Sequence, residues 1–250
     1  MNDTFLSAAQ APANLWDDLL SRTAPAEPPS LGALWPAVIV VALVILLPGA
    51  RRWGRALTTL VHEAGHAGVG ILTGRRFLGF VVERDLSGHA VTSGRSRGPA
   101  RVLTTWAGYP APAVLGATMV VAALRGWGGI VAVLAVLALL VLLVMSRSVR
   151  TVGLVLLVGV LTAALWWWGD AVVGVPLRAG LVAGIGLALL VGAWDSLADV
   201  GRSRDRAQDH RTLAEITVLP AGLWLVTWFL VDAAASAAAA WSVWDLVRGL

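Results

Sequence analysis

The sequence predicts an all-α polytopic membrane protein with six to seven membrane helices. Of its 250 residues, 58% are hydrophobic and only 14% are charged, and the mean hydropathy is +0.77, which is too apolar for a soluble domain of this size. Charge-free stretches also recur at lengths close to the roughly 20 residues that cross a bilayer as a helix. These features exclude an ordinary cytosolic enzyme, and the absence of cysteine excludes disulfides and thiolate metal sites.

The chain is expected to begin with an exposed N-terminal arm, residues 1–30, which is rich in proline and acidic residues. Residues 31–250 are expected to form a single membrane-embedded domain. Six apolar stretches are long enough to span a bilayer, and only the last two contain a charged residue, Arg178 and Asp232 respectively. The six stretches cover residues 31–50, 102–124, 126–145, 151–169, 171–194 and 216–244.

A seventh helix is expected at residues 56–73, which are apolar except for His62, Glu63 and His66. The polar segment that follows, residues 75–98, contains two short runs of apolar and small residues on either side of a turn at residues 85–88. This pattern is typical of two strands joined by a tight connection. We therefore predict a small β-hairpin directly after the helix.

Arginine content predicts the orientation of the chain in the cell membrane. All 19 basic residues are Arg, and the positive-inside rule puts the Arg-rich segments 74–101, 146–150 and 200–212 in the cytoplasm. The arginines at positions 51, 52 and 55 fit this orientation only if the helix at 56–73 is re-entrant, so a spanning and a re-entrant helix remain alternatives. Since no basic stretch is interleaved with aromatic residues, we expect a lipid bilayer and no nucleic acid as partner.

The segment His62-Glu63-Ala64-Gly65-His66 contains the candidate metal-binding and catalytic residues. Residues four apart lie on one face of a helix, so the two imidazoles are able to bind one zinc ion, and Glu63 lies beside them as a general base for zinc-activated water. Such side chains are costly in an apolar membrane helix unless they are paired or functional. The membrane context therefore favours a zinc site over a chance occurrence of the motif.

A catalytic zinc site needs a third protein ligand. In a chain without cysteine that ligand must be His89, His210 or a carboxylate. Asp195 and Asp199 lie four residues apart at the end of an apolar stretch, so either is able to bind the metal while the other orients a histidine or a water molecule. Alternatively, both are solvated beside the arginines that follow. Ion pairing with arginine is the favoured role of two further acids, Asp205 and Asp209.

Several segments match a known family. The helix expected at residues 56–73, which contains both histidines, leads directly into Leu72-Thr73-Gly74-Arg75-Arg76. The next apolar stretch begins with a segment that includes Trp106-Ala107-Gly108-Tyr109-Pro110. Arg147 to Leu154, before an apolar run, and Asp209 to Thr217, before Leu219-Pro220, complete the set. Together these segments resemble the short B-like branch of the site-2 protease family of intramembrane zinc metallopeptidases, over roughly residues 56–230.

The resemblance implies a zinc ion held by His62, His66 and an aspartate of a later span, with Glu63 as the base. Asp199, in Ser196-Leu197-Ala198-Asp199-Val200, is the expected third ligand, and Asp195 is the second choice. The Leu-Asp-Gly and Asn-Pro-Asp-Gly settings of better-known members of the family do not occur in this sequence.

The expected activity is zinc-dependent hydrolysis of peptide bonds in membrane protein or peptide substrates, within or near the bilayer. One alternative is a non-catalytic membrane scaffold or adaptor that retains the zinc site for structure. Another is a metal-ion transporter in which the histidines and the Asp195 and Asp199 pair line a path. Transporters of that kind are expected to show inverted repeats or several spans with inward-facing polar groups, which this sequence lacks.

Overall fold

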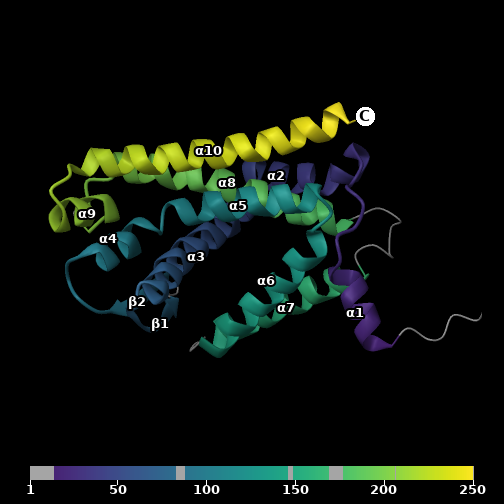
Figure 1. The fold of residues 1–250 in the computed structure, drawn as a ribbon, viewed down its shortest axis with the longest axis horizontal. Coiled ribbons are helices and arrows are strands. Elements are labelled where there is room, and N and C mark those ends of the chain that lie inside the picture. The colour runs from purple at the N-terminus through teal and green to yellow at the C-terminus, as the bar shows by residue number, and fades with distance from the viewer. Residues whose placement is uncertain (1–13, 83–87, 146–148, 169–176, 206, 250) are drawn as a thin grey trace, which may run out of the picture.

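The computed structural model describes residues 14–82, 88–145, 149–168, 177–205 and 207–249. Residues 1–13 of the expected arm, part of the expected turn at 85–88 and part of the Arg-rich segment 146–150 lie outside these ranges. Helices dominate the fold (Figure 1). A 3-10 turn (Leu31–Leu34) precedes α2, and the α-helices are α1 (Leu15–Thr23), α2 (Trp35–Leu46), α3 (Pro48–Leu72), α4 (Pro99–Trp106), α5 (Pro110–Leu124), α6 (Gly128–Met145), α7 (Val149–Trp168), α8 (Leu177–Arg202), α9 (Asp209–Ile216) and α10 (Ala221–Arg248).

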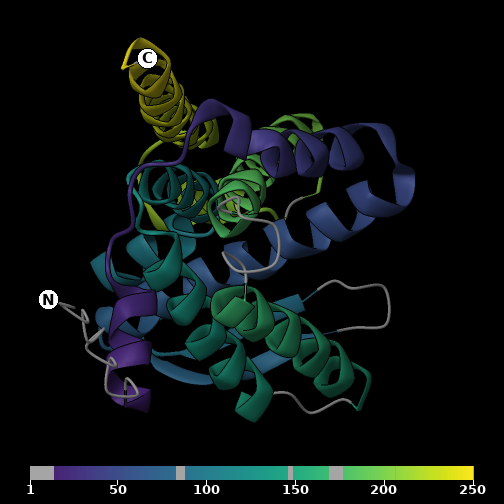
Figure 2. The same cartoon turned by 90° about the vertical axis from the view of Figure 1, so that its right-hand side faces the viewer.

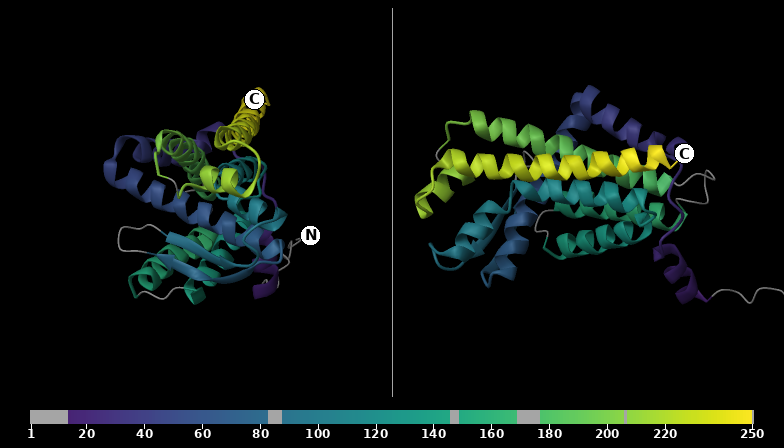
Figure 3. Two further views of the ribbon diagram at one scale, coloured as in Figure 1. Left: turned by 90° about the vertical axis from the view of Figure 1, so that its left-hand side faces the viewer. Right: turned by 45° about the horizontal axis from the view of Figure 1, so that its top comes forward.

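The core forms around α8, which packs against α5 and α2 and buries 13 of its 26 residues. Small residues make this packing close: a Cβ atom on Gly186 would lie 2.6 Å from the carbonyl oxygen of Gly116 in α5, and one on Gly184 would lie 2.9 Å from the Cα of Ala37 in α2. Small residues at such contacts let helix backbones approach in membrane proteins. Helix α10 lies along α5 and α8 (Figure 3).

Two helix pairs are sharply bent. Helices α2 and α3 meet at 102°, and α4 and α5 meet at 59°. At the first break Leu47 has an extended backbone (φ −102°, ψ 117°), as expected of a residue that precedes proline, since the ring of Pro48 disfavours the helical conformation before it. The second break is followed by Pro110 at the start of α5.

The structure does not support the prediction of six to seven membrane spans. In the described parts of the chain, α8 and α10 are long and apolar enough to cross a membrane alone, and the two bent pairs raise the count to at most four. The sequence stretches 31–50 and 56–73 fall in one bent pair. Helices α6 and α7 provide only the shorter apolar segments Gly128–Val144 and Val155–Trp168, and they pack on each other on the side of the molecule away from α2 and α10 (Figure 2).

Two strands follow α3, in the segment for which the sequence predicts a hairpin. Strands β1 (Arg76–Val82) and β2 (Gly88–Ser93) pair antiparallel, with an irregular register between Phe77 and Gly79. Both strands lie against α3. The histidine helix therefore has a strand pair at its C-terminal end and the helical core at its other end (Figure 1).

The close contact between α5 and α8 predicts a strong effect of Gly186→Val. The added side chain would overlap the Gly116 carbonyl. We therefore expect the free energy of unfolding to fall by about 1 to 3 kcal/mol and the midpoint of thermal unfolding to be lower for the protein purified in detergent. Gly159→Val in α7 is the matched control, because no described atom lies within 4 Å of its Cβ position. Equal effects of the two substitutions would contradict this account of the core.

Candidate metal centre

Helix α3 brings His62, Glu63 and His66 together. The Nε2 atoms of the two imidazoles lie 3.0 Å apart, with the rings nearly perpendicular. The three side chains each offer one ligand atom, and these atoms lie within 4.8 Å of one another. One helix therefore supplies two nitrogen ligands and an adjacent carboxylate.

Helix α4 sets the protonation pattern of His66. The Nδ1 of His66 lies 2.6 Å from the carbonyl oxygen of Thr104. A carbonyl oxygen only accepts, so Nδ1 carries the proton and donates it. In the neutral ring the Nε2 lone pair then remains available, which is the arrangement that metal-binding histidines commonly show.

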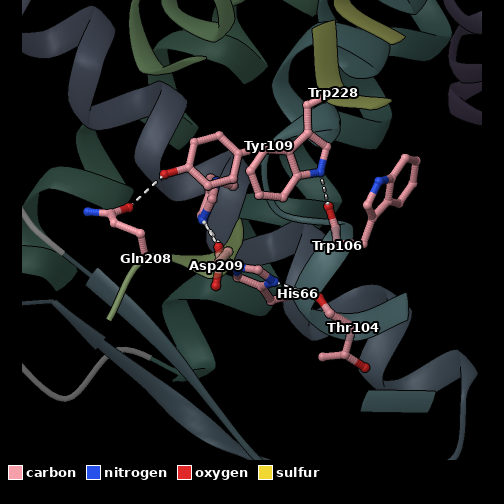
Figure 4. A network of polar contacts seen from close by, with 8 residues as sticks. His66, Thr104, Trp106, Tyr109, Gln208, Asp209 and Trp228 are labelled. Carbon is pink, nitrogen blue, oxygen red and sulfur yellow. Dashed lines mark hydrogen bonds and ion pairs between the residues drawn. The ribbon is translucent and has the colours of Figure 1, made fainter. Parts of the chain in front are cut away.

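Helix α9 brings a carboxylate to both imidazoles. Oδ2 of Asp209, the first residue of α9, lies 3.4 Å from His62 Nε2 and 3.2 Å from His66 Nε2. Burial raises the pKa of Asp209, but its interactions with the two imidazoles outweigh burial and hold that pKa well below its usual range. The ionised carboxylate therefore faces both ring nitrogens, and Figure 4 shows Asp209 beside His66.

The donor set fits a zinc ion. The three atoms, two Nε2 and one Oδ2, are separated by 3.0, 3.2 and 3.4 Å. Ligand atoms at the corners of a tetrahedron, about 2.0 to 2.1 Å from a central zinc, are about 3.3 Å apart. Two imidazoles and one carboxylate also form a ligand set that is known for catalytic zinc.

The two aspartates that the sequence favoured as third ligand, Asp195 and Asp199, both lie on α8. Oδ2 of Asp195 lies 2.8 Å from Nη2 of Arg51, and Arg51 precedes His62 by about three turns of α3, or about 16 Å along the helix axis. Asp199 is exposed on α8. The acid that the structure brings against both imidazoles is Asp209, for which the sequence favoured ion pairing with arginine.

A polar and aromatic network joins α9 to the bend between α4 and α5 (Figure 4). The hydroxyl of Tyr109 donates to Oε1 of Gln208, the N-cap residue of α9, over 3.0 Å. The Tyr109 ring meets His62 edge-on at 4.6 Å and stacks on the buried Trp228 at 4.3 Å. Trp228 in turn donates to the carbonyl of Trp106. Sequence reasoning missed these contacts, because none follows from a local spacing.

A cavity of about 440 Å³ opens beside the donor atoms. Nine of its ten lining residues carry polar side chains, and they come from α3, from α4 and the bend after it, and from the start of α9. The lining residues are His62, Glu63, His66, Arg101, Thr104, Thr105, Tyr109, Ala207, Gln208 and Asp209. The cavity is therefore suited to polar groups rather than to an apolar side chain.

Comparison with known proteins identifies the family. The sequence model of the Peptidase M50B-like family matches residues 36–239, which extend from α2 into α10 and include the whole donor set. The chain belongs to this family. Membership in the Peptidase M50B-like family confirms the resemblance to site-2 proteases and makes the chain a member of a membrane metallopeptidase family. No significant match was found among curated proteins or among solved structures.

The contact between α3 and the α4–α5 bend predicts that Gly108→Ala disrupts the imidazole pair. A methyl group on Gly108 would lie 2.7 Å from Cε1 of His62 and closer still to the ring of His66. We expect zinc affinity to fall by about tenfold or more, measured by titration with a competing chelator. Gly68→Ala, on the same helix as the histidines but with no described atom within 4 Å of its Cβ position, should leave the affinity unchanged. Unchanged affinity in Gly108→Ala would contradict the prediction.

Proposed function

We propose that this M50B-like chain is a zinc-dependent peptidase that hydrolyses peptide bonds of membrane protein or peptide substrates within or near the bilayer. The observation that carries the proposal is the convergence of Asp209 on the imidazole pair of α3, beside Glu63 and a polar cavity. This arrangement and the family membership favour a peptidase over a scaffold or a metal-ion transporter.

In this proposal His62, His66 and Asp209 hold the zinc ion, and Asp209 takes the place that the sequence suggested for Asp199. A zinc ion held there supplies Lewis acidity, which lowers the pKa of water to about 7 and polarises a substrate carbonyl. The Thr104 carbonyl keeps the His66 ring oriented by accepting from Nδ1. Orientation of this kind commonly accounts for about a tenfold to hundredfold effect on metal affinity or activity.

Glu63 is the proposed general base. Its carboxylate accepts a proton from the water that attacks the carbonyl carbon of the scissile peptide bond, and a C–O bond forms. The same proton then passes from Glu63 to the departing nitrogen as the C–N bond breaks. Glu63 lines the cavity together with the imidazoles, so water and substrate reach it from the same space.

We also propose that the site opens toward the cytoplasm. Among the lining residues, Arg101 ends one of the Arg-rich segments assigned to that side, 74–101. Three others, Ala207, Gln208 and Asp209, belong to the Arg-rich segment 200–212. A transmembrane substrate helix hides its peptide groups in internal hydrogen bonds, so it must unwind before cleavage. Unwinding costs less free energy where water replaces those hydrogen bonds. Cleavage is therefore favoured near the cytoplasmic end of the substrate helix.

The identity of the third ligand is tested by metal content. Asp209→Ala removes the carboxylate whose Oδ2 lies 3.4 Å from His62 Nε2 and 3.2 Å from His66 Nε2, so we expect the purified protein to lose its zinc. Asp195→Ala and Asp199→Ala should each retain about one zinc per chain. Retention of zinc by Asp209→Ala together with its loss in Asp199→Ala would reverse the assignment.

The role of Glu63 is tested by Glu63→Gln. We expect zinc content to stay at the parental level while cleavage of a library of quenched-fluorescent apolar peptides falls by at least about a hundredfold, the usual contribution of a general base. Glu215→Gln, an exposed acid of α9, is the matched control and should cleave like the parent. Cleavage by Glu63→Gln at the parental rate would remove this mechanism.

A further inference from the structure

The side of the cavity formed by α4 contains two polar groups that the proposed mechanism does not use. Arg101 and Thr105 both line the cavity. They are four residues apart on α4, so they lie on one helix face in successive turns. The guanidinium of Arg101 and the hydroxyl of Thr105 therefore border the same space as Glu63 and the imidazoles.

These two groups differ from other polar groups of the cavity in having no partner among the residues that the structure describes. Tyr109 bonds Gln208, the Thr104 hydroxyl bonds the Ala100 carbonyl, and Asp209 faces the imidazoles. Within the described residues, neither the guanidinium of Arg101 nor the hydroxyl of Thr105 has a hydrogen bond or an ion pair. Both are donors, and both border the cavity, so each is available to a ligand that enters it.

The electrostatic surroundings favour an anion at this place. Arg75 lies near Arg101 and donates to the carbonyl of Arg95 over 2.8 Å. Burial lowers the pKa of Arg75, and repulsion from Arg101 lowers it further. Of the two acids that line the cavity, Asp209 is held by the imidazoles. A ligand that brings a negative charge to Arg101 would relieve the repulsion between the two guanidinium groups.

We propose that Arg101 and Thr105 form a subsite for a carboxylate of the substrate. A guanidinium presents parallel N–H donors that match the two oxygens of a carboxylate, and a neighbouring hydroxyl adds a third donor. This inference rests on the proposed peptidase function, since it concerns the substrate of the same cavity. The carboxylate belongs either to the C-terminus of a peptide or to an Asp or Glu side chain. In the first case the enzyme cleaves near the C-terminal end of its substrates, and in the second it cleaves internal bonds near an acidic residue.

The test measures binding rather than turnover. Fluorophore-labelled ten-residue alanine–leucine peptides are titrated by anisotropy into Glu63→Gln protein, with zinc and after chelation. One probe has a free C-terminal carboxylate and one a C-terminal amide. A further amidated set has a single Glu at each position in turn, and a matching set has Gln. We expect the free-carboxylate probe, or at least one Glu probe, to bind about tenfold or more tighter than its uncharged counterpart.

Arg101→Gln should abolish this preference while leaving the affinity for uncharged probes within about twofold, and Thr105→Val should reduce it. Arg97→Gln, an exposed arginine of the preceding loop, is the matched control and should keep it. Equal binding of charged and uncharged probes would overturn the proposal. So would a preference that survives Arg101→Gln, or an equal loss of affinity for all probes.

The two proposals fail in distinguishable ways. If protein with Glu63 intact cleaves no probe while the Arg101-dependent preference persists, the peptidase function fails and the carboxylate subsite stands. If probes are cleaved in a Glu63-dependent manner without any carboxylate preference, the peptidase stands and the subsite is rejected. Which class of probe binds more tightly decides between a C-terminal carboxylate and an acidic side chain.

Discussion

The donor set depends on the close approach of α3 to the bend between α4 and α5. A Cβ atom on Gly65 would lie 2.7 Å from the carbonyl oxygen of Ala107, and Gly108 lies directly against both imidazoles. Larger side chains at either glycine would separate the two elements and lengthen the 2.6 Å contact between His66 Nδ1 and Thr104. The same approach puts Tyr109 against His62, so it also determines where α9 and Asp209 attach.

The break between α4 and α5 has a chemical consequence. In an uninterrupted helix the carbonyl of Thr104 would accept the N–H of Gly108, four residues later. Because α4 ends at Trp106, this carbonyl is available to accept the proton of His66 instead. The bend thus converts a backbone group that would stabilise a helix into one that orients an imidazole. An apolar segment at membrane depth tolerates such a break only where other groups satisfy the freed backbone atoms.

Sequence reasoning succeeded where the relevant geometry is local. The spacing of His62 and His66 is a property of one helix, and the structure has both Nε2 atoms 3.0 Å apart. The third carboxylate depends instead on how a short helix far along the chain docks. Neighbouring arginines made ion pairing the favoured role of Asp209, but the guanidinium of Arg211 donates to the carbonyl of Ser203. The stretches 31–50 and 56–73 were predicted as two separate helices for a related reason, because the length of an apolar run does not reveal the 102° bend between the helices that form there.

Nine polar side chains line one cavity of this apolar chain, and their contacts with one another affect the cost of keeping them there. An isolated ionised side chain within a bilayer is expensive, whereas here an imidazole donates to a carbonyl, a phenol donates to an amide and a carboxylate faces two ring nitrogens. Each satisfied group reduces the penalty of burying its neighbour. The residues that complete the cavity come from α4, from the bend after it and from the start of α9 rather than from the middle of α8 or α10. Glu63 therefore borders a polar cavity rather than the apolar surface of the helices.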